Sequence, residues 1–218
     1  QAWVLLTEAG VYDGNAAIHL EPECEGGNYI VRLPEEEEAF NVCASVPEVK
    51  LPWQSPWRVI MVSPSLAGIF ESHIVTSLSR SQAFEDTDWI TPGRASWSWW
   101  SASDSPKDYD AMKAFIDLSS ELRWEYFLVD ANWNHMQGGD LEKLAQYAET
   151  KDVGLLVWYN SGGPHNVVTE EPRDRMHETA VRRETFAWLQ EMGIKGVKVD
   201  FFQSDKSCIT AQYTDILK

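Results

Sequence analysis

Residues 125–130 read EYFLVD, residues 153–159 read VGLLVWY and residues 196–202 read GVKVDFF. Each run is short and nearly continuous in apolar residues, which is typical of a parallel strand that is buried on both faces. Segments with the apolar spacing of a helix lie between these runs. This alternation predicts an α/β fold built on a parallel sheet.

The same alternation extends outward from these runs. A β-like run precedes them at 95–100, and helical patterns cover 108–122, 141–150, 178–192 and 209–217. Four strand–helix units in about 125 residues match half of a (β/α)8 barrel, which needs roughly 250 residues. An open doubly wound sheet is the alternative, but no GxGxxG or GxxxxGK[ST] phosphate loop follows any of the predicted strands. We therefore expect residues 91–218 to form the first four βα units of a TIM-type barrel.

Residues 1–90 have a different character. Short β-rich runs at 2–7, 17–20, 28–33 and 57–62 are separated by glycine and proline, which predicts an all-β domain followed by a linker. The acidic run at 35–38 is predicted to be a solvated turn. The run at 69–78 fits either a strand or a short helix.

The composition is that of a folded globular protein and excludes two classes of function. Hydrophobic residues make up 44% of the 218 residues and charged residues 24%, with a formal net charge of −16. No uninterrupted apolar stretch approaches the ~18 residues of a membrane helix. A strongly acidic chain repels nucleic-acid phosphates, so a nucleic-acid partner is not expected.

The three cysteines, Cys24, Cys43 and Cys208, form no CxxC pair, so the spacing of a zinc site is absent. A bridge from Cys24 to Cys43 is one alternative. The other, which we favour, is that the thiols are buried and free.

Tryptophan is abundant, with 11 copies. Trp97, Trp99 and Trp100 lie together, and Trp133 lies between asparagines. Aromatic faces beside polar side chains suit sugar rings, which stack through their C–H faces and hydrogen-bond through their hydroxyls. Core packing is the equally weighted alternative for any one of them.

Polar and aromatic side chains lie at the carboxyl ends of the four predicted strands, where barrels of this type place their active sites. These ends read WSWW at 97–100, DANW at 130–133, WYN at 158–160 and KVD at 198–200. Lys198 and Asp200 are two residues apart, so they point to the same side of a strand. A cation beside a carboxylate keeps it ionised, which suits a nucleophile better than an acid. His165 follows a glycine-rich turn and is a candidate binding residue.

The motifs that carry these residues resemble glycoside hydrolase family 97. They are EDTDWITPGRASWSWW from Glu85, VDANWN, GLLVWYNSGGPHN, EPRDRM and GVKVDFFQSDKS. The first third resembles the end of the family's N-terminal β-sandwich, through LLTEAG and PWRVI. The resemblance implies an exo-acting α-glycosidase with a (β/α)8 catalytic domain and a calcium ion near the sugar. It also implies a periplasmic or secreted location in a bacterium.

The resemblance assigns roles to individual residues. Retaining, α-galactosidase-type members have an Asp nucleophile at the end of strand four, where this chain has Asp200. Glu8 is implied to be a calcium ligand. The side chains expected to contact the sugar substrate, an oligosaccharide or other α-glycoside, are Trp97, Trp99, Asp130, Asn132, Trp133, Trp158, Asn160, His165, Lys198, Asp205 and Lys206.

A retaining mechanism also needs a second carboxyl group as acid and base. In the family this Glu comes from a later strand, so we expect it beyond Lys218 and expect the chain to be a fragment of a longer enzyme. The alternatives are an α-glucosidase of the same family and a non-catalytic carbohydrate-binding protein. A metal-dependent hydrolase is a weaker rival, because no HxH pair lies at a strand end.

Overall fold

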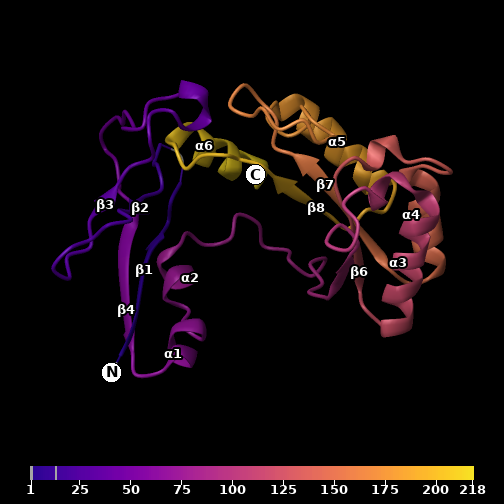
Figure 1. Cartoon of the computed structure of the whole chain (residues 1–218), viewed down its shortest axis with the longest axis horizontal. Coiled ribbons are helices and arrows are strands. Elements are labelled where there is room, and N and C mark those ends of the chain that lie inside the picture. Colours follow the sequence, from indigo (N-terminus) through magenta and orange to yellow (C-terminus); the bar gives the residue numbers. More distant parts are fainter. Residues whose placement is uncertain (1, 13) are drawn as a thin grey trace. The chain divides into compact units, whose positions relative to one another are not determined.

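The computed structural model describes residues 2–12 and 14–218. They separate into two compact units, and Figure 1 shows the elements of both. The first unit contains the described residues up to Asp86 together with Phe202–Lys218, and the second is Thr87–Phe201. The domain limits expected from the sequence, 1–90 and 91–218, stay predictions.

The second unit is built on a four-stranded parallel sheet. The strands are β5 (Ala95–Trp97), β6 (Tyr126–Val129), β7 (Gly154–Asn160) and β8 (Gly196–Asp200), and they pair in chain order. All three pairings are parallel. Phe127, Val129, Leu155 and Val157 are almost completely buried, which is why these strands are nearly continuous in apolar residues. The predicted parallel α/β sheet is confirmed, while a complete barrel stays a prediction.

Helices connect the parallel strands, as parallel pairing requires. They are α3 (Tyr109–Leu122), α4 (Leu141–Thr150) and α5 (Thr179–Glu191), with short 3-10 turns η2 (Ser105–Lys107) and η3 (Trp133–His135). Asp108 caps α3 by accepting from the amides of Asp110 and Ala111, and Asp140 caps α4 in the same way. Met112, Ile116 and Leu144 are fully buried on the inner faces of α3 and α4. The helices predicted at 108–122, 141–150 and 178–192 are therefore confirmed to within a residue at either end.

The first unit contains two antiparallel pairs. In one, β1 (Trp3–Ala9) pairs with β4 (Trp57–Ser63); in the other, β2 (His19–Leu20) pairs with β3 (Val31–Arg32). All four β-rich runs predicted from the sequence contain a strand. One face of the β1–β4 pair buries Ala9, Val59 and Met61 against two short helices, α1 (Leu66–Phe70) and α2 (Ile74–Leu78). The open question about 69–78 is therefore settled in favour of helix.

The acidic run at 35–38 is a turn that leads into η1 (Glu38–Asn41), and its first three glutamates are exposed. The predicted turn is therefore present, but Glu38 is only partly exposed, and its carboxylate accepts a hydrogen bond from Ser204 at 3.0 Å. Ser204 precedes α6 (Ser207–Ile216), the helix expected near 209–217. None of the helices in the described part of the chain is both long enough and apolar enough to cross a bilayer.

A disulfide joins Cys43 to Cys208, and Cys24 is free. Both alternatives drawn from the sequence, a Cys24–Cys43 bridge and three free thiols, are wrong. The physical reason is that the paired cysteines are 165 residues apart in the sequence. At such a separation, cysteine spacing does not indicate which residues pair. The bond ties α6 to the segment that follows η1.

We predict that this disulfide stabilises the first unit against unfolding. Cys43→Ser or Cys208→Ser should lower its free energy of unfolding by about 2–5 kcal/mol, the range typical of native disulfides. Urea unfolding monitored by tryptophan fluorescence measures this loss, and Cys24→Ser is the matched control with little effect. Thiol titration in denaturant without reductant should find one thiol; finding three would contradict the bond.

Candidate active site

The carboxyl ends of the parallel strands bring four of the predicted site residues to one edge of the sheet. Trp97 ends β5, Asp130 directly follows β6, Asn160 ends β7 and Asp200 ends β8. Asn160 and Asp200 are register partners. Because the strands are parallel, their carboxyl ends share an edge. The second unit therefore has the expected cluster of polar side chains at one edge of its sheet.

The ammonium group of Lys198 lies between two carboxylates. Its Nζ is 3.1 Å from Asp130 Oδ2 and 3.2 Å from Asp200 Oδ2. It also lies 4.7 Å from the centre of the Trp97 ring, within the range of a cation–π contact. The side chain of Asp130 is only 4% exposed, while those of Lys198 and Asp200 are 33% and 37% exposed. The cation and one carboxylate are thus open to solvent, and the second carboxylate is not.

The carboxylate of Asp130 accepts three hydrogen bonds. Its Oδ2 accepts from the indole N–H of Trp97 at 2.6 Å and from Lys198, and its Oδ1 accepts from the amide of Ala131 at 2.8 Å. Three donors directed at one buried carboxylate fix its orientation. Asp130 therefore serves to hold Trp97 and Lys198 in place.

Asp200 is surrounded by donors in a similar way but remains half-exposed. Trp158 donates its indole N–H to Oδ2 at 3.1 Å, and the amide of Phe201 donates to Oδ1 at 2.9 Å. Burial alone raises the pKa of this carboxyl, but the bonds from Trp158, Phe201 and Lys198 outweigh burial, so the pKa lies below its usual range. An accessible carboxylate that stays ionised is suited to nucleophilic attack.

The predicted tryptophans divide into two groups. Trp97 stacks on Trp99 with ring centres 5.9 Å apart, and Trp100 lies 5.3 Å from Trp97 at a tilt. Trp99 and Trp100 are 40% and 80% exposed, so this group offers aromatic surface to a ligand. Trp133 and Trp158 are instead buried, and the Trp133 indole donates to the carbonyl of Trp158 at 2.9 Å. Their rings have the contacts of core residues, and no sugar can stack on a buried face.

Two other residues expected to contact sugar, both asparagines, form hydrogen bonds within the protein instead. Asn160 is fully buried, and its amide group donates to the carbonyls of Val168 and Glu170. Asn132 accepts from the amide of Glu171 at 3.1 Å. These contacts favour structural roles for both asparagines.

His165 is 3% exposed, and its Nε2 has no hydrogen-bond partner among the described residues. Burial, together with the nearby His177 and Arg173, lowers the pKa of the imidazole. A neutral imidazole with a free ring nitrogen is capable of binding a ligand hydroxyl, so His165 stays a candidate.

The remaining predicted residues belong to the first unit and make contacts there. Asp205 pairs with His19 at 2.9 Å. Lys206 is fully buried and donates to the carbonyl of Glu36 at 2.5 Å. The ammonium of Lys206 is thus already engaged by a backbone group, which does not favour a sugar contact.

Glu8 does not fit the role of a calcium ligand in this structure. Its carboxylate forms an ion pair with Arg58 and accepts from the amide of Ile18 at 2.7 Å, so both oxygens are engaged. Calcium needs six to eight oxygen ligands, and the described residues contain no group of three or more His, Cys, Asp or Glu side chains placed to hold a metal.

The structure gives three residues near Asp200 roles that the sequence did not indicate. Ser161 and Asn166 bind the backbone that follows Asp200, and Trp158 acts through its N–H rather than its ring face. The motif NSGGPHN contains Ser161 and Asn166, but only the parallel pairing of β7 with β8 shows what they face.

The sequence and the structure of this chain resemble those of known proteins. Residues 89–218 match the family model described as Glycoside hydrolase 97, and residues 1–80 match the Glycosyl-hydrolase 97 N-terminal model. A retaining alpha-galactosidase of Bacteroides thetaiotaomicron is 28% identical over 202 residues, which are 85% of this chain and 28% of that protein. A probable retaining alpha-galactosidase of Streptomyces bingchenggensis is 28% identical over 176 residues, 75% of this chain and 26% of that protein.

Two solved structures extend the comparison. A beta-arabinopyranosidase superposes with a TM-score of 0.88 at 35% identity, over 99% of this chain and 34% of that one. A Glycoside Hydrolase Family 97 enzyme from Pseudoalteromonas sp. strain K8, in complex with panose, superposes with a TM-score of 0.68 at 14% identity, over 99% of this chain and 37% of that one. The chain therefore spans about a quarter to a third of the length of these relatives.

The contacts of Asp200 generate a prediction about its titration. Trp158→Phe keeps an aromatic ring in the core but removes the N–H that donates to Oδ2, so the pKa of Asp200 should rise. Because the folded state holds Asp200 ionised where the unfolded chain binds a proton, this group stabilises the fold above the ordinary aspartate pKa. That contribution is lost as the pH falls through the lowered pKa. Carboxyl ¹³C NMR, with Asp200 assigned from Asp200→Asn, measures the change.

Trp133→Phe is the matched control, since it removes a buried indole N–H that donates to a carbonyl rather than to Asp200. The pKa of Asp200 should be unchanged in this variant. An equal rise in both variants would attribute the effect to packing and contradict the role of the Trp158 N–H.

Proposed function

The chain belongs to glycoside hydrolase family 97, and from that premise we propose that it carries the nucleophile side of the active site of a retaining exo-α-glycosidase of α-galactosidase type. The observation that carries the proposal is Asp200, a half-exposed, ionised carboxylate held by three donors at the end of β8. Nucleophilic attack requires an accessible carboxylate that stays ionised, whereas binding a sugar does not require one. The family assignment, in turn, supports the (β/α)8 architecture for the catalytic domain.

In the proposed reaction, a carboxylate oxygen of Asp200 attacks the anomeric carbon and the bond from that carbon to the leaving oxygen breaks. A covalent glycosyl-enzyme forms, and water then hydrolyses it with net retention of configuration. The leaving oxygen takes a proton from a second carboxyl group. Asp130 does not suit that task, because its side chain is only 4% exposed and both of its oxygens already accept hydrogen bonds from the protein.

The other side chains at this edge support the same reaction. Lys198 and the exposed rings near Trp97 are placed to receive sugar hydroxyls and a ring face. The two carboxylates exceed the single ammonium by one negative charge, which favours the positive charge that develops on the sugar in the transition state. Asp200, Lys198, Trp97 and Trp99 are therefore the residues that we assign to the substrate.

A second candidate substrate has a specific observation in its favour. The relative solved as a beta-arabinopyranosidase is more similar in sequence, at 35%, than the two alpha-galactosidases, at 28%. A β-L-arabinopyranoside has the ring stereochemistry of an α-D-galactoside but lacks its hydroxymethyl group, so one arrangement of Asp200 and Lys198 suits both. An α-glucoside differs at carbon four and is the third candidate.

The disulfide gives the proposal a cellular context. Stable disulfides are typical of proteins outside the cytoplasm, and the bond between Cys43 and Cys208 supports a periplasmic or secreted location. The calcium ion that the resemblance implies is a proposal for the whole enzyme. The contacts of Glu8 do not support a calcium ligand at that residue.

The test of the proposed function uses the protein expressed from its own gene. It is assayed with aryl α-galactoside, aryl β-L-arabinopyranoside and aryl α-glucoside, and proton NMR follows the anomer released first. We expect hydrolysis of a galacto-configured substrate with retention. Asp200→Ala should lower kcat by a factor on the order of 10⁴, as the loss of a reacting group does, and azide should partly restore turnover as a glycosyl azide.

Asp117→Ala is the matched control, because Asp117 is an aspartate on α3 that pairs with Lys151 and Tyr147 outside the site. It should keep the parental rate. Release of the inverted anomer first, or full activity in Asp200→Ala, would contradict the proposed nucleophile.

A further inference from the structure

The backbone directly after Asp200 has an unusual conformation. Phe201 has a φ of 63°, in the left-handed region that aromatic residues rarely adopt. Such a conformation persists only where the surrounding structure holds it, and it is common at functional sites. The contacts that hold Phe201 therefore show what the turn does.

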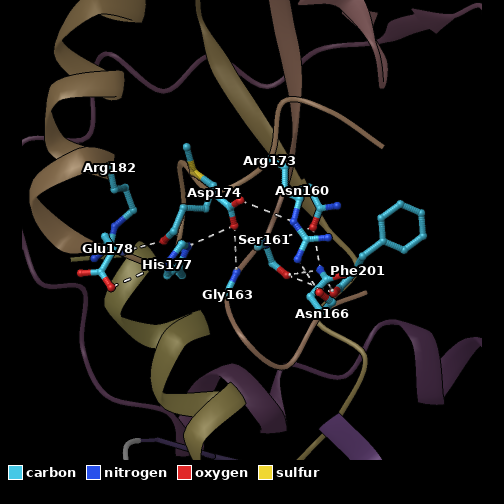
Figure 2. A network of polar contacts seen from close by, with 12 residues as sticks. Asn160, Ser161, Gly163, Asn166, Arg173, Asp174, His177, Glu178, Arg182 and Phe201 are labelled. Carbon is cyan, nitrogen blue, oxygen red and sulfur yellow. Dashed lines mark hydrogen bonds and ion pairs between the residues drawn. The ribbon is translucent and has the colours of Figure 1, made fainter. Parts of the chain in front are cut away.

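Both peptide groups that flank the Cα of Phe201 are held by the segment after β7. The carbonyl of Asp200 accepts from the amide of Ser161 at 2.8 Å. The carbonyl of Phe201 accepts from Ser161 Oγ at 3.0 Å and from Asn166 Nδ2 at 2.8 Å (Figure 2). Because Ser161 and Asn166 hold both peptide groups, their hydrogen bonds stabilise the left-handed conformation of Phe201.

Asn166 is the residue around which this arrangement is organised. It is 3% exposed, and its Nδ2 lies 2.6 Å from Asn160 Oδ1 as well as close to Ser161 and Phe201. Its Oδ1 accepts from the amide of Val168 at 2.8 Å. The guanidinium of Arg173 donates to the backbone carbonyl of Asn166. Every polar group of this side chain is engaged, so its amide has a single orientation.

The turn acts on Asp200 through one hydrogen bond. The N–H of Phe201 belongs to the same peptide group as the carbonyl that Ser161 holds, and it donates to Asp200 Oδ1 at 2.9 Å. If the turn relaxed, this N–H would rotate away and the carboxylate would lose one of its three donors. The orientation of the carboxylate therefore depends on the residues that hold Phe201.

We propose that Asn166, assisted by Ser161, is a positioning residue for Asp200: by holding the carbonyl of Phe201 it keeps the Phe201 N–H on the carboxylate and the carboxylate aimed at the anomeric carbon. This inference rests on the proposed function of Asp200 as nucleophile. In this role Asn166 affects the reaction through the position of Asp200 and does not contact the substrate. A purely structural asparagine would affect stability and leave the chemical step unchanged.

The experiment compares three substitutions in the protein expressed from its own gene. Asn166→Ala removes the donor, Asn166→Asp replaces it with an oxygen that faces three acceptors, and Ser161→Ala removes one of the two side-chain donors to Phe201. Ser119→Ala is the matched control, because Ser119 is also a fully buried serine, and it bonds Ser96 and the carbonyl of Tyr126 instead. Thermal melts establish that each variant is folded.

The kinetic readout is turnover of whichever aryl glycoside the parent protein hydrolyses best. We expect kcat to fall about 10²-fold in Asn166→Ala, as for a reacting group displaced by about 1 Å, with KM little changed. Asn166→Asp should be at least as impaired, and Ser161→Ala less so. Ser119→Ala should keep the parental kcat.

The second readout is independent of activity. Carboxyl ¹³C NMR should show the pKa of Asp200 raised in Asn166→Ala and unchanged in Ser119→Ala, because only the first weakens the bond from Phe201. Folded Asn166→Ala or Ser161→Ala with parental kcat and an unchanged pKa of Asp200 would overturn the inference. Full activity in Asp200→Ala would instead overturn the proposed nucleophile, while a raised pKa in Asn166→Ala would still support the positioning contact.

Discussion

The Lys198 ammonium between Asp130 and Asp200 is the interaction on which the rest of the site depends. Two carboxylates close together repel each other, and this repulsion limits how near they can lie unless a cation stands between them. Lys198 removes that constraint for both, while Trp97 and Ala131 complete the shell of Asp130 and Trp158 and Phe201 that of Asp200. The parallel sheet makes this possible, because β6 and β8 end at the same edge with β7 between them.

The segment after β7 has a different task from the strand ends beside it. Asn160, Ser161 and Asn166 are buried, and hydrogen bonds join them to one another and to backbone groups. Buried polar groups that are fully satisfied specify one local structure and resist movement. This segment therefore acts as rigid support for the end of β8, and the polar side chains that meet solvent lie on the neighbouring strands.

Local signals in the sequence predicted most of the second unit. The helix at 141–150 is predicted to the residue, and in the structure Asp140 caps it. The strand ends follow from the alternation of apolar runs and helices. Contacts between distant residues could not be predicted in this way. Cys43 and Cys208 are 165 residues apart, and Trp133 and Trp158 have the same local surroundings as a sugar-binding tryptophan. Their burial depends on how the strands and helices pack, which composition and spacing do not reveal.

The division between buried and exposed side chains bears on what the site can bind. A ligand reaches the groups that the fold leaves open, and at this edge these include Lys198, Asp200 and the aromatic surface of Trp97 and Trp99. One aromatic surface, one cation and one carboxylate are enough to orient a single sugar ring over a nucleophile. Residues such as Asn160, whose amide is fully engaged by backbone carbonyls, add nothing to an extended series of subsites. A small set of open groups beside a rigid, satisfied support is the arrangement expected of an enzyme that removes one terminal sugar at a time, and it supports the exo-acting glycosidase proposed for this chain.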